Sequence, residues 1–238
     1  MNRLLCISIL GDPAVADRKV FADLPEGCAD WNWVRAKLEQ VKLADKVEID
    51  GVDVSLGQEL PSPDDYDGVV VGGSYHNANE GHDWQLRAIE WLREWRDTER
   101  PFFGICGGHQ MAAVALGGAV DPMGGEPFAE TAPIELTDEG RDHFLFDGLL
   151  PTPKVHFGCY DHVTRMPDGA TLLATYRGIV AATDLGGSWY STQFHPEASA
   201  RGMSVGWTGI IPSNGVRYDE TADGARILGN FLRGTGLV

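Results

Sequence analysis

The sequence has no long apolar segment, no closely spaced pair of cysteines and no excess of basic residues. The absence of any run of about 18 apolar residues excludes a membrane-spanning helix. None of the four cysteines belongs to a Cys-x-x-Cys pair, so neither a structural zinc site nor a redox dithiol is expected. Lys and Arg number 19 against 35 Asp and Glu, and the net charge of -16 argues against nucleic acid or an anionic membrane as a partner.

The N-terminus has too short an apolar stretch for a secretory signal. Residues 4–10 form this run, which ends before Asp12 without a small-residue cleavage site. We interpret it as a buried first strand, and we expect the protein to be cytoplasmic. A reducing compartment is also the setting that an active thiolate requires.

Strand and helix signals alternate along the first half of the chain. Apolar runs typical of buried strands lie at residues 4–10, 47–49, 66–71 and 100–105, and helical spacing lies at residues 31–41, 83–95 and 108–116. In the second of these helices, the predicted buried face consists of Leu86, Ile89, Leu92 and Trp95. Further strands are predicted at residues 131–136, 171–176, 179–183 and 189–194, with a closing helix at 221–232. The pattern predicts one α/β domain over residues 1–238, with an open, mostly parallel central sheet and helices on both faces.

The most informative segment is PFFGICGGHQM at residues 101–111, where Cys106 stands between a buried strand and a helix. A nucleophile on such a tight turn adopts a strained backbone, and the small neighbours Gly104 and Gly108 relieve the crowding. The turn places the thiol at the carboxyl edge of the sheet, and the helix N-terminus favours its thiolate. The N–H of Gly107 points to the place where an oxyanion would form. A buried structural cysteine, or an α/β-hydrolase with Cys in place of Ser, would show the same pattern.

A second segment, STQFHPE at residues 191–197, ends a predicted strand with His-Pro-Glu. Pro196 stops strand pairing and fixes the local backbone, so His195 and Glu197 can converge across a bend. In a nucleophile–base–orienter arrangement, His195 takes the proton from Cys106 and Glu197 holds the other imidazole nitrogen. We therefore predict these three residues to be catalytic.

A third segment closes the predicted strand at residues 66–71 with Gly72 and Gly73. The loop that follows offers backbone N–H groups to an oxyanion, and we predict Gly73 as the second donor opposite Gly107. An ordinary strand-to-helix turn would have the same composition.

The same loop contains His76 and His82 on either side of Glu80. Their spacing does not provide the i, i+4 pair by which two histidines of one helix bind a metal. No metal site is expected.

Together the three segments resemble class I glutamine amidotransferases, especially stand-alone domains similar to the glutaminase part of GMP synthetase. The resemblance rests on GGS at residues 72–74, GICGGHQ at 104–110 and QFHPE at 193–197. It implies the flavodoxin-like architecture of that family, a Cys106–His195–Glu197 triad and a γ-glutamyl thioester that releases ammonia from glutamine. No cofactor is implied.

The resemblance also concerns the substrate. It implies that Gln110 helps to hold glutamine near the nucleophile, and we expect Ser74 and Tyr160 to contact the substrate as well. Many family members have Ser-His-x-Asp-x-Val where this chain has GCYDHV at residues 158–163. Because the Ser-His pair is replaced, we expect the glutamate end of the substrate to be held differently.

Three functions fit these features. The one that we favour is a glutaminase acting on glutamine or a γ-glutamyl small molecule and supplying ammonia to a separate synthetase subunit, since these residues contain no ATP-binding motif of a synthetase. The second is a free-standing γ-glutamyl hydrolase or peptidase acting on γ-glutamyl amines or peptides, which needs the same triad and is favoured by the altered segment. The third is a non-catalytic binding domain, against which the complete triad argues.

Overall fold

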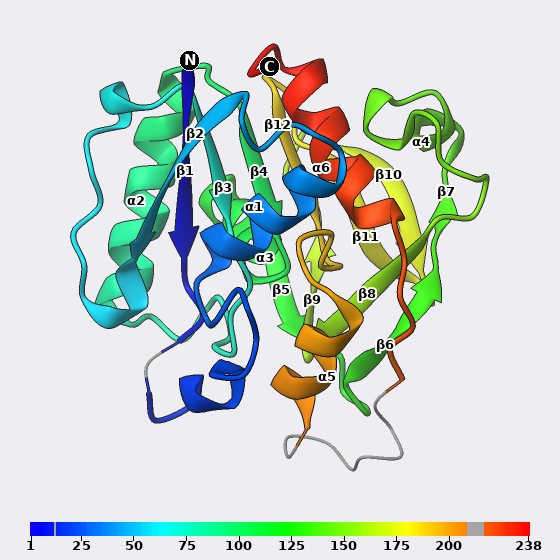
Figure 1. Ribbon diagram of the computed structural model, residues 1–238, viewed down its shortest axis with the longest axis horizontal. Coiled ribbons are helices and arrows are strands. Elements are labelled where there is room, and N and C mark those ends of the chain that lie inside the picture. The colour runs from blue at the N-terminus through cyan, green and yellow to red at the C-terminus, as the bar shows by residue number, and fades with distance from the viewer. Residues whose placement is uncertain (12, 209–216) are drawn as a thin grey trace.

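The computed structural model describes residues 1–11, 13–208 and 217–238 (Figure 1). Its centre is an eight-stranded sheet with the order β2-β1-β3-β4-β12-β11-β10-β7. These strands are β1 (Asn2–Ser8), β2 (Val47–Asp53), β3 (Gly68–Val71), β4 (Phe102–Ile105), β7 (Glu135–Leu136), β10 (Thr171–Tyr176), β11 (Ile179–Asp184) and β12 (Trp189–Thr192). From β2 to β12 the neighbours are parallel, whereas β11, β10 and β7 are antiparallel to their neighbours.

Helices cover both faces of this sheet (Figure 1). One face packs against α1 (Asp30–Gln40) and α6 (Asp223–Gly234), and the other against α2 (Asp83–Asp97) and α3 (Gly107–Ala115). Alternate residues of β1 belong to the two cores, with Leu4 and Cys6 in the first and Leu5 and Ile7 in the second. Burial on both faces explains why the strands are continuously apolar. The predicted α/β class and mostly parallel sheet are confirmed.

Two small antiparallel ladders and one more helix lie near the carboxyl ends of the parallel strands (Figure 1). The first ladder pairs β5 (Ala119–Pro122) with β9 (Asp161–Arg165), and the second pairs β6 (Phe128–Pro133) with β8 (Lys154–Cys159). The helix is α5 (Ala200–Trp207), and the short α4 (Asp138–Arg141) lies against β10 at the far edge. Together β8 and α5 bring new side chains to the edge at which Cys106 is predicted to lie.

Two details of the predicted elements are wrong. The single strand predicted at residues 131–136 is two strands, because the chain leaves the ladder with β8 after Pro133 and joins β10 at Glu135. In α2, Leu86 is 57% exposed rather than buried. The face of α2 that packs on the sheet carries three buried tryptophans, Trp84, Trp91 and Trp95. Leu86 lies outside this face.

The glycine-rich stretch at residues 198–218 fits, by its sequence, either a cover over the site or a plain surface loop. Its first part is instead the helix α5, which begins after the N-cap Ser199, whose hydroxyl accepts from the N–H of Gly202. Residues 209–216 lie outside the described part of the chain.

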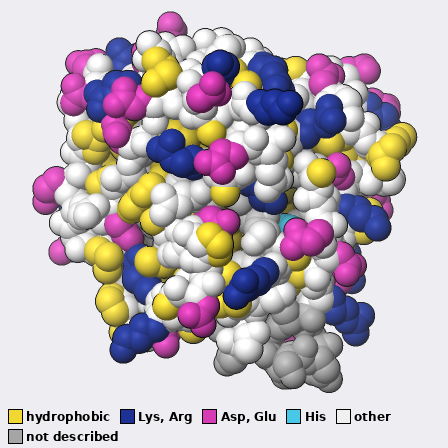
Figure 2. All heavy atoms as spheres, in the orientation of Figure 1, with side chains coloured by type: hydrophobic (Ala, Val, Ile, Leu, Met, Phe, Trp, Pro, Cys, Tyr) yellow, Lys and Arg dark blue, Asp and Glu magenta, His cyan; other side chains and the backbone are white. Residues whose placement is uncertain are grey.

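The described helices include none that is long and apolar enough to cross a membrane. Figure 2 shows one face of the molecule, on which acidic and basic side chains are intermixed. That face therefore has no concentrated basic patch of the kind that binds a polyanion.

The contact between α3 and β3 depends on Gly108 having no side chain. A Cβ at this position would lie 2.3 Å from the carbonyl oxygen of Val71. We expect Gly108→Ala to lower the free energy of unfolding by about 1–3 kcal/mol, as overpacked cores do. Urea denaturation measures the change. Gly125→Ala is the matched control, because a Cβ there meets nothing within 4 Å, and equal stability of the two variants would contradict the account.

Candidate active site

The predicted nucleophile lies at a strained junction. Strand β4 ends at Ile105, α3 begins at Gly107, and Cys106 between them has φ 49° and ψ −99°. For a residue with a side chain, such a conformation costs about 1–3 kcal/mol. It is held by the N–H of Cys106, which donates to the Thr192 carbonyl at 2.7 Å. The structure therefore shows the strained backbone that the sequence predicts for this turn.

The Cys106 thiol is nearly enclosed by protein. Its exposure is 3%, and Sγ lies 3.4 Å from the carbonyl oxygen of Gly158, to which it donates. The side-chain amide of Gln193 donates to Sγ at 3.5 Å. The sulfur thus faces both the end of β12 and the end of β8.

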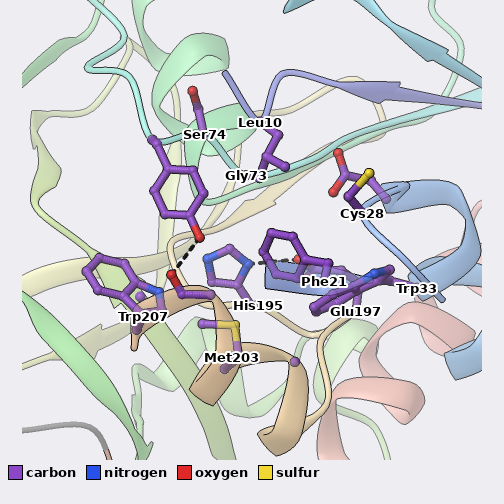
Figure 3. Close-up of a pocket in the computed structure, with 15 residues that line it drawn as sticks. Leu10, Phe21, Cys28, Trp33, Gly73, Ser74, His195, Glu197, Met203 and Trp207 are labelled. Carbon is purple, nitrogen blue, oxygen red and sulfur yellow. Dashed lines mark hydrogen bonds and ion pairs between the residues drawn. The ribbon is translucent and has the colours of Figure 1, made fainter. Parts of the chain in front are cut away.

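His195 and Glu197 form the pair that the His-Pro-Glu segment predicts. Nδ1 of His195 lies 2.8 Å from Oε1 of Glu197 (Figure 3), and Glu197 is only 5% exposed. The N–H of His195 donates to the carbonyl of His156 in β8 at 2.8 Å, which fixes the bend after β12. The carboxylate can therefore orient the imidazole and stabilise its protonated form.

The electrostatic surroundings of His195 favour its protonated form. Burial by itself lowers the pKa of His195, but the charges of Glu197 and Cys106, with hydrogen bonds to both side chains, raise it well above the usual 6.5. A proton held at this imidazole is available to a leaving group next to the ring.

The two predicted oxyanion donors lie on adjacent segments. The N–H of Gly108 donates to the carbonyl of Gly72 at 2.9 Å, which joins the loop after β3 to the nucleophile turn. A Cβ on Gly73 would lie 2.7 Å from Cε1 of His195, and one on Gly107 would lie 2.7 Å from Ser74. Within the described part of the chain, the N–H groups of Gly73 and Gly107 have no protein acceptor. The structure therefore leaves both donors available, and their role in binding an oxyanion stays a prediction.

The three predicted substrate-binding residues do not converge on one point. Ser74 lines a cavity beside His195 (Figure 3), and its hydroxyl accepts from the N–H of His76 at 3.0 Å. Gln110 donates instead to the Asp161 carbonyl at 2.8 Å and to the Gln193 side chain at 3.2 Å. Gln110 is thus connected to Cys106 through Gln193.

Tyr160 packs its ring against Trp207 with the centroids 4.9 Å apart, and it is 36% exposed. It is not among the described residues that line the cavity. Direct contact of Tyr160 with a substrate stays a prediction.

The sequence reasoning missed two residues that contact the site. Gln193 belongs to the QFHPE segment, so its position was available as a signal even though its role was not. Asp30, the first residue of α1, lines the cavity, and a Cβ on Gly72 would lie 2.5 Å from its Oδ2. Burial raises the pKa of Asp30 to about 7, a hydrogen bond with Ser8 opposes this, and the charge of Glu197 adds to it. No local pattern in the sequence marks Asp30.

His76, Glu80 and His82 come together more closely than their spacing predicts. Oε2 of Glu80 lies 2.5 Å from Nδ1 of His76 and 2.8 Å from Nε2 of His82. His82 is also the N-cap of α2 and shares a capping box with Gln85. The carboxylate thus bridges two imidazoles at the start of a helix, and this arrangement fixes the loop that follows Gly73.

The family model for glutamine amidotransferase class-I matches residues 33–206. A γ-glutamyl-L-1-hydroxyisopropylamide hydrolase from Pseudomonas sp is 33% identical over 143 residues, which cover 56% of this chain and 48% of that protein. A glutamine-hydrolyzing GMP synthase subunit from Halobacterium salinarum is 31% identical over 156 residues, which cover 64% of this chain and 79% of that protein. The chain thus spans about half the length of the first relative and most of the second.

Among solved structures, a glutamine amidotransferase from Thermotoga maritima superposes with a TM-score of 0.70 at 21% identity, covering 99% of this chain and 92% of that one. A glutamine amidotransferase from Methylobacillus flagellatus gives a TM-score of 0.74 at 16% identity, covering 99% and 96%. At such low identity the likeness shows the fold, and it confirms the architecture that the sequence resemblance implies.

The raised pKa of His195 can be tested through Glu197, whose charge is the largest cause that raises it. We expect Glu197→Gln to lower this pKa, so that the imidazole loses its proton at a lower pH than in the wild type. The alkaline limb of the activity profile should move in the same direction. An NMR titration of His195 measures the pKa.

Glu80→Gln is the matched control for this titration, because Glu80 also bonds histidines but belongs to the separate loop cluster. It should leave the pKa of His195 unchanged. An unchanged pKa in Glu197→Gln would mean that Glu197 does not set the charge of the imidazole.

Proposed function

Because this chain belongs to the glutamine amidotransferase class-I family, we propose that it cleaves the amide bond of a γ-glutamyl substrate through a thioester on Cys106. The substrate is glutamine or a related γ-glutamyl amide. Cys106 and His195 follow neighbouring strands of the central sheet, β4 and β12, and we also propose that residues 1–238 form a single domain. The free state of all four cysteines supports a reducing, cytoplasmic setting.

The proposed reaction has two halves. The thiol of Cys106 passes its proton to His195, Sγ attacks the γ-carbonyl carbon, and the resulting oxyanion is stabilised by the N–H groups of Gly73 and Gly107. His195 gives its proton to the leaving nitrogen, so that ammonia or an amine departs and a thioester remains. A water molecule that loses its proton to His195 then attacks the thioester, glutamate is released and the thiol is restored.

One observation carries this proposal: the 2.8 Å contact between Nδ1 of His195 and Oε1 of Glu197, next to the cysteine of the strained turn. The contact leaves Nε2 as the ring nitrogen for proton transfer. It also keeps the imidazole protonated, the state required when the amine leaves. A buried structural cysteine would need neither a strained backbone nor a histidine with an elevated pKa.

A second candidate is the supply of ammonia to a separate synthetase subunit. It is favoured by the similarity to the glutamine-hydrolyzing GMP synthase subunits, which extends over 79% of the Halobacterium protein and, for Haloarcula marismortui, again 79%. The cysteine chemistry is the same in both cases. The difference lies in whether the chain alone turns over its substrate at a useful rate.

We expect Cys106→Ala and Cys106→Ser to lower kcat by at least about three orders of magnitude, because no other group replaces the nucleophile. Steady-state release of ammonia and of amine from glutamine and from simple γ-glutamyl amides measures the loss. Cys6→Ala is the matched control, since Cys6 is a buried free cysteine of the β1 core. Full activity in Cys106→Ala would exclude the mechanism.

The same assay separates the two candidates. Efficient turnover of a γ-glutamyl amide by the purified chain supports a free-standing hydrolase. If glutamine and the amides are all cleaved slowly while a glutamine-like alkylating agent still labels Cys106, the chain is an amidotransferase subunit that needs its partner.

A further inference from the structure

A cavity with aromatic walls lies beside His195 (Figure 3). Its aromatic side chains and Met203 come from three parts of the chain: Phe21 and Trp33 from the segment around α1, Tyr75 from the loop after β3, and Met203 and Trp207 from α5. Cys106, Gln110 and Gln193 are not among the described residues that line the cavity. The cavity therefore adjoins the proton donor rather than the two glutamines.

Glycines allow these aromatic side chains to come close. A Cβ on each of three glycines would collide with a side chain of the wall: Gly158 with Trp207 Nε1 at 2.3 Å, Gly202 with Trp33 Cη2 at 2.3 Å, and Gly206 with Tyr75 Oη at 2.9 Å. The hydroxyl of Tyr75 also donates to the Gly206 carbonyl at 2.9 Å. The walls are thus built by complementary small and large residues from separate segments.

Gly158 connects this wall to the nucleophile. Its carbonyl accepts from Sγ of Cys106 at 3.4 Å, while Trp207 and Met203 occupy the space that a side chain at position 158 would need. The glycine that replaces the serine of the Ser-His pair therefore lies where side chains of α5 pack against the site. The indole ring of Trp207 fills the space that a side chain at position 158 would occupy.

The charges on the lining restrict what can bind. Among the described residues that line the cavity, the ionisable groups include the carboxyls of Asp30 and Glu197 and the imidazole of His195, but no Lys or Arg. A ligand with a carboxylate would find no Lys or Arg among the described lining residues, the imidazole of His195 is already paired with Glu197, and the ligand would face two carboxyl groups. A carboxylate buried without a partner is strongly disfavoured.

We propose that this cavity is the leaving-group subsite and that it takes an apolar, aromatic amine without a carboxylate. The inference rests on the proposed γ-glutamyl cleavage and narrows its substrate to the γ-glutamyl amides of arylalkylamines. His195 transfers its proton to the amide nitrogen as the C–N bond breaks, so the substituent on that nitrogen must lie beside the imidazole. The aromatic walls hold this substituent, and the neutral amine leaves as the thioester forms on Cys106.

The test compares three substrates that share the γ-glutamyl group: γ-glutamylbenzylamide, γ-glutamylphenylalanine and glutamine. We expect kcat/KM for the benzylamide to exceed both others by at least about tenfold, a ratio within the reach of one aromatic contact and one unpaired charge. The second substrate has the same ring with a carboxylate, so it isolates the effect of charge. Equal or better cleavage of either comparison substrate would overturn the subsite.

Two variants test the wall itself. Trp207→Ala should lower the preference for the benzylamide over glutamine about tenfold, and Trp207→Phe should largely keep it. Gly158→Ser should lower turnover of the benzylamide, because the new side chain meets Trp207. When Gly158→Ser is combined with Trp207→Ala, the space for the new side chain returns. Turnover of glutamine should then be restored, but not the preference for the benzylamide over glutamine. Unchanged preference in Trp207→Ala, with an unchanged unfolding midpoint, would overturn the inference.

Failure of the subsite is distinguishable from failure of the proposed reaction. If the reaction is wrong, Cys106→Ala cleaves the substrates as fast as the wild type, whatever their order. If only the subsite is wrong, turnover depends on Cys106 but shows no preference for the benzylamide. Binding gives a readout that needs no turnover: N-benzylacetamide, which has the same ring on a neutral amide, should bind the wild-type protein in calorimetry, and Trp207→Ala should weaken this binding about tenfold. No binding of N-benzylacetamide would contradict the subsite.

Discussion

The left-handed backbone of Cys106 is the constraint on which the site depends. A residue with a side chain holds φ 49° only where the surroundings impose it. Here they do so from two sides, through the hydrogen bond from the Cys106 N–H to the end of β12 and through the close contact of Gly108 with the end of β3. The same two contacts bring His195 and Gly73 to Cys106, because each follows one of those strand ends. The contacts that impose the backbone conformation of Cys106 are therefore the same contacts that assemble the site.

The electrostatics follow from this assembly. His195 is buried, which alone would keep it neutral, and it holds its proton because Glu197 and Cys106 are both next to the ring. Asp30 lies behind the loop of Gly72, and burial holds its pKa near neutrality. Among the described residues that line the cavity, His195 is the one basic side chain. That distribution suits the departure of a neutral amine, and it is the basis on which the aromatic cavity is proposed to exclude carboxylates.

Much of the fold and of the site could be predicted from the sequence, because the relevant signals are local. A strand that runs into glycines, a cysteine at the junction and a proline between His195 and Glu197 are each visible within about ten residues. The order of these segments also matched that of the family. The split between β6 and β7 could not be predicted, since it depends on which partner strand each half finds.

The parts that escaped prediction are contacts between distant segments. Gln110 donates to Gln193 rather than pointing alone at the nucleophile, and Trp207 fills the space above Gly158. In neither case does the sequence near one residue indicate its partner. The replacement of Ser-His by Gly-Cys was visible as a departure, but the contact of Trp207 and Met203 with Gly158 appears only when α5 is placed against β8.

The central claim is that Cys106 carries the γ-glutamyl group during turnover. Acid quenching of the protein during steady-state cleavage of a γ-glutamyl amide, followed by peptide mapping with mass spectrometry, tests it directly. We expect a γ-glutamyl group on the peptide that contains Cys106, released by hydroxylamine as thioesters are, and no such group in Cys106→Ala. A γ-glutamyl group on another residue, such as Ser74 or Cys159, would contradict the claim.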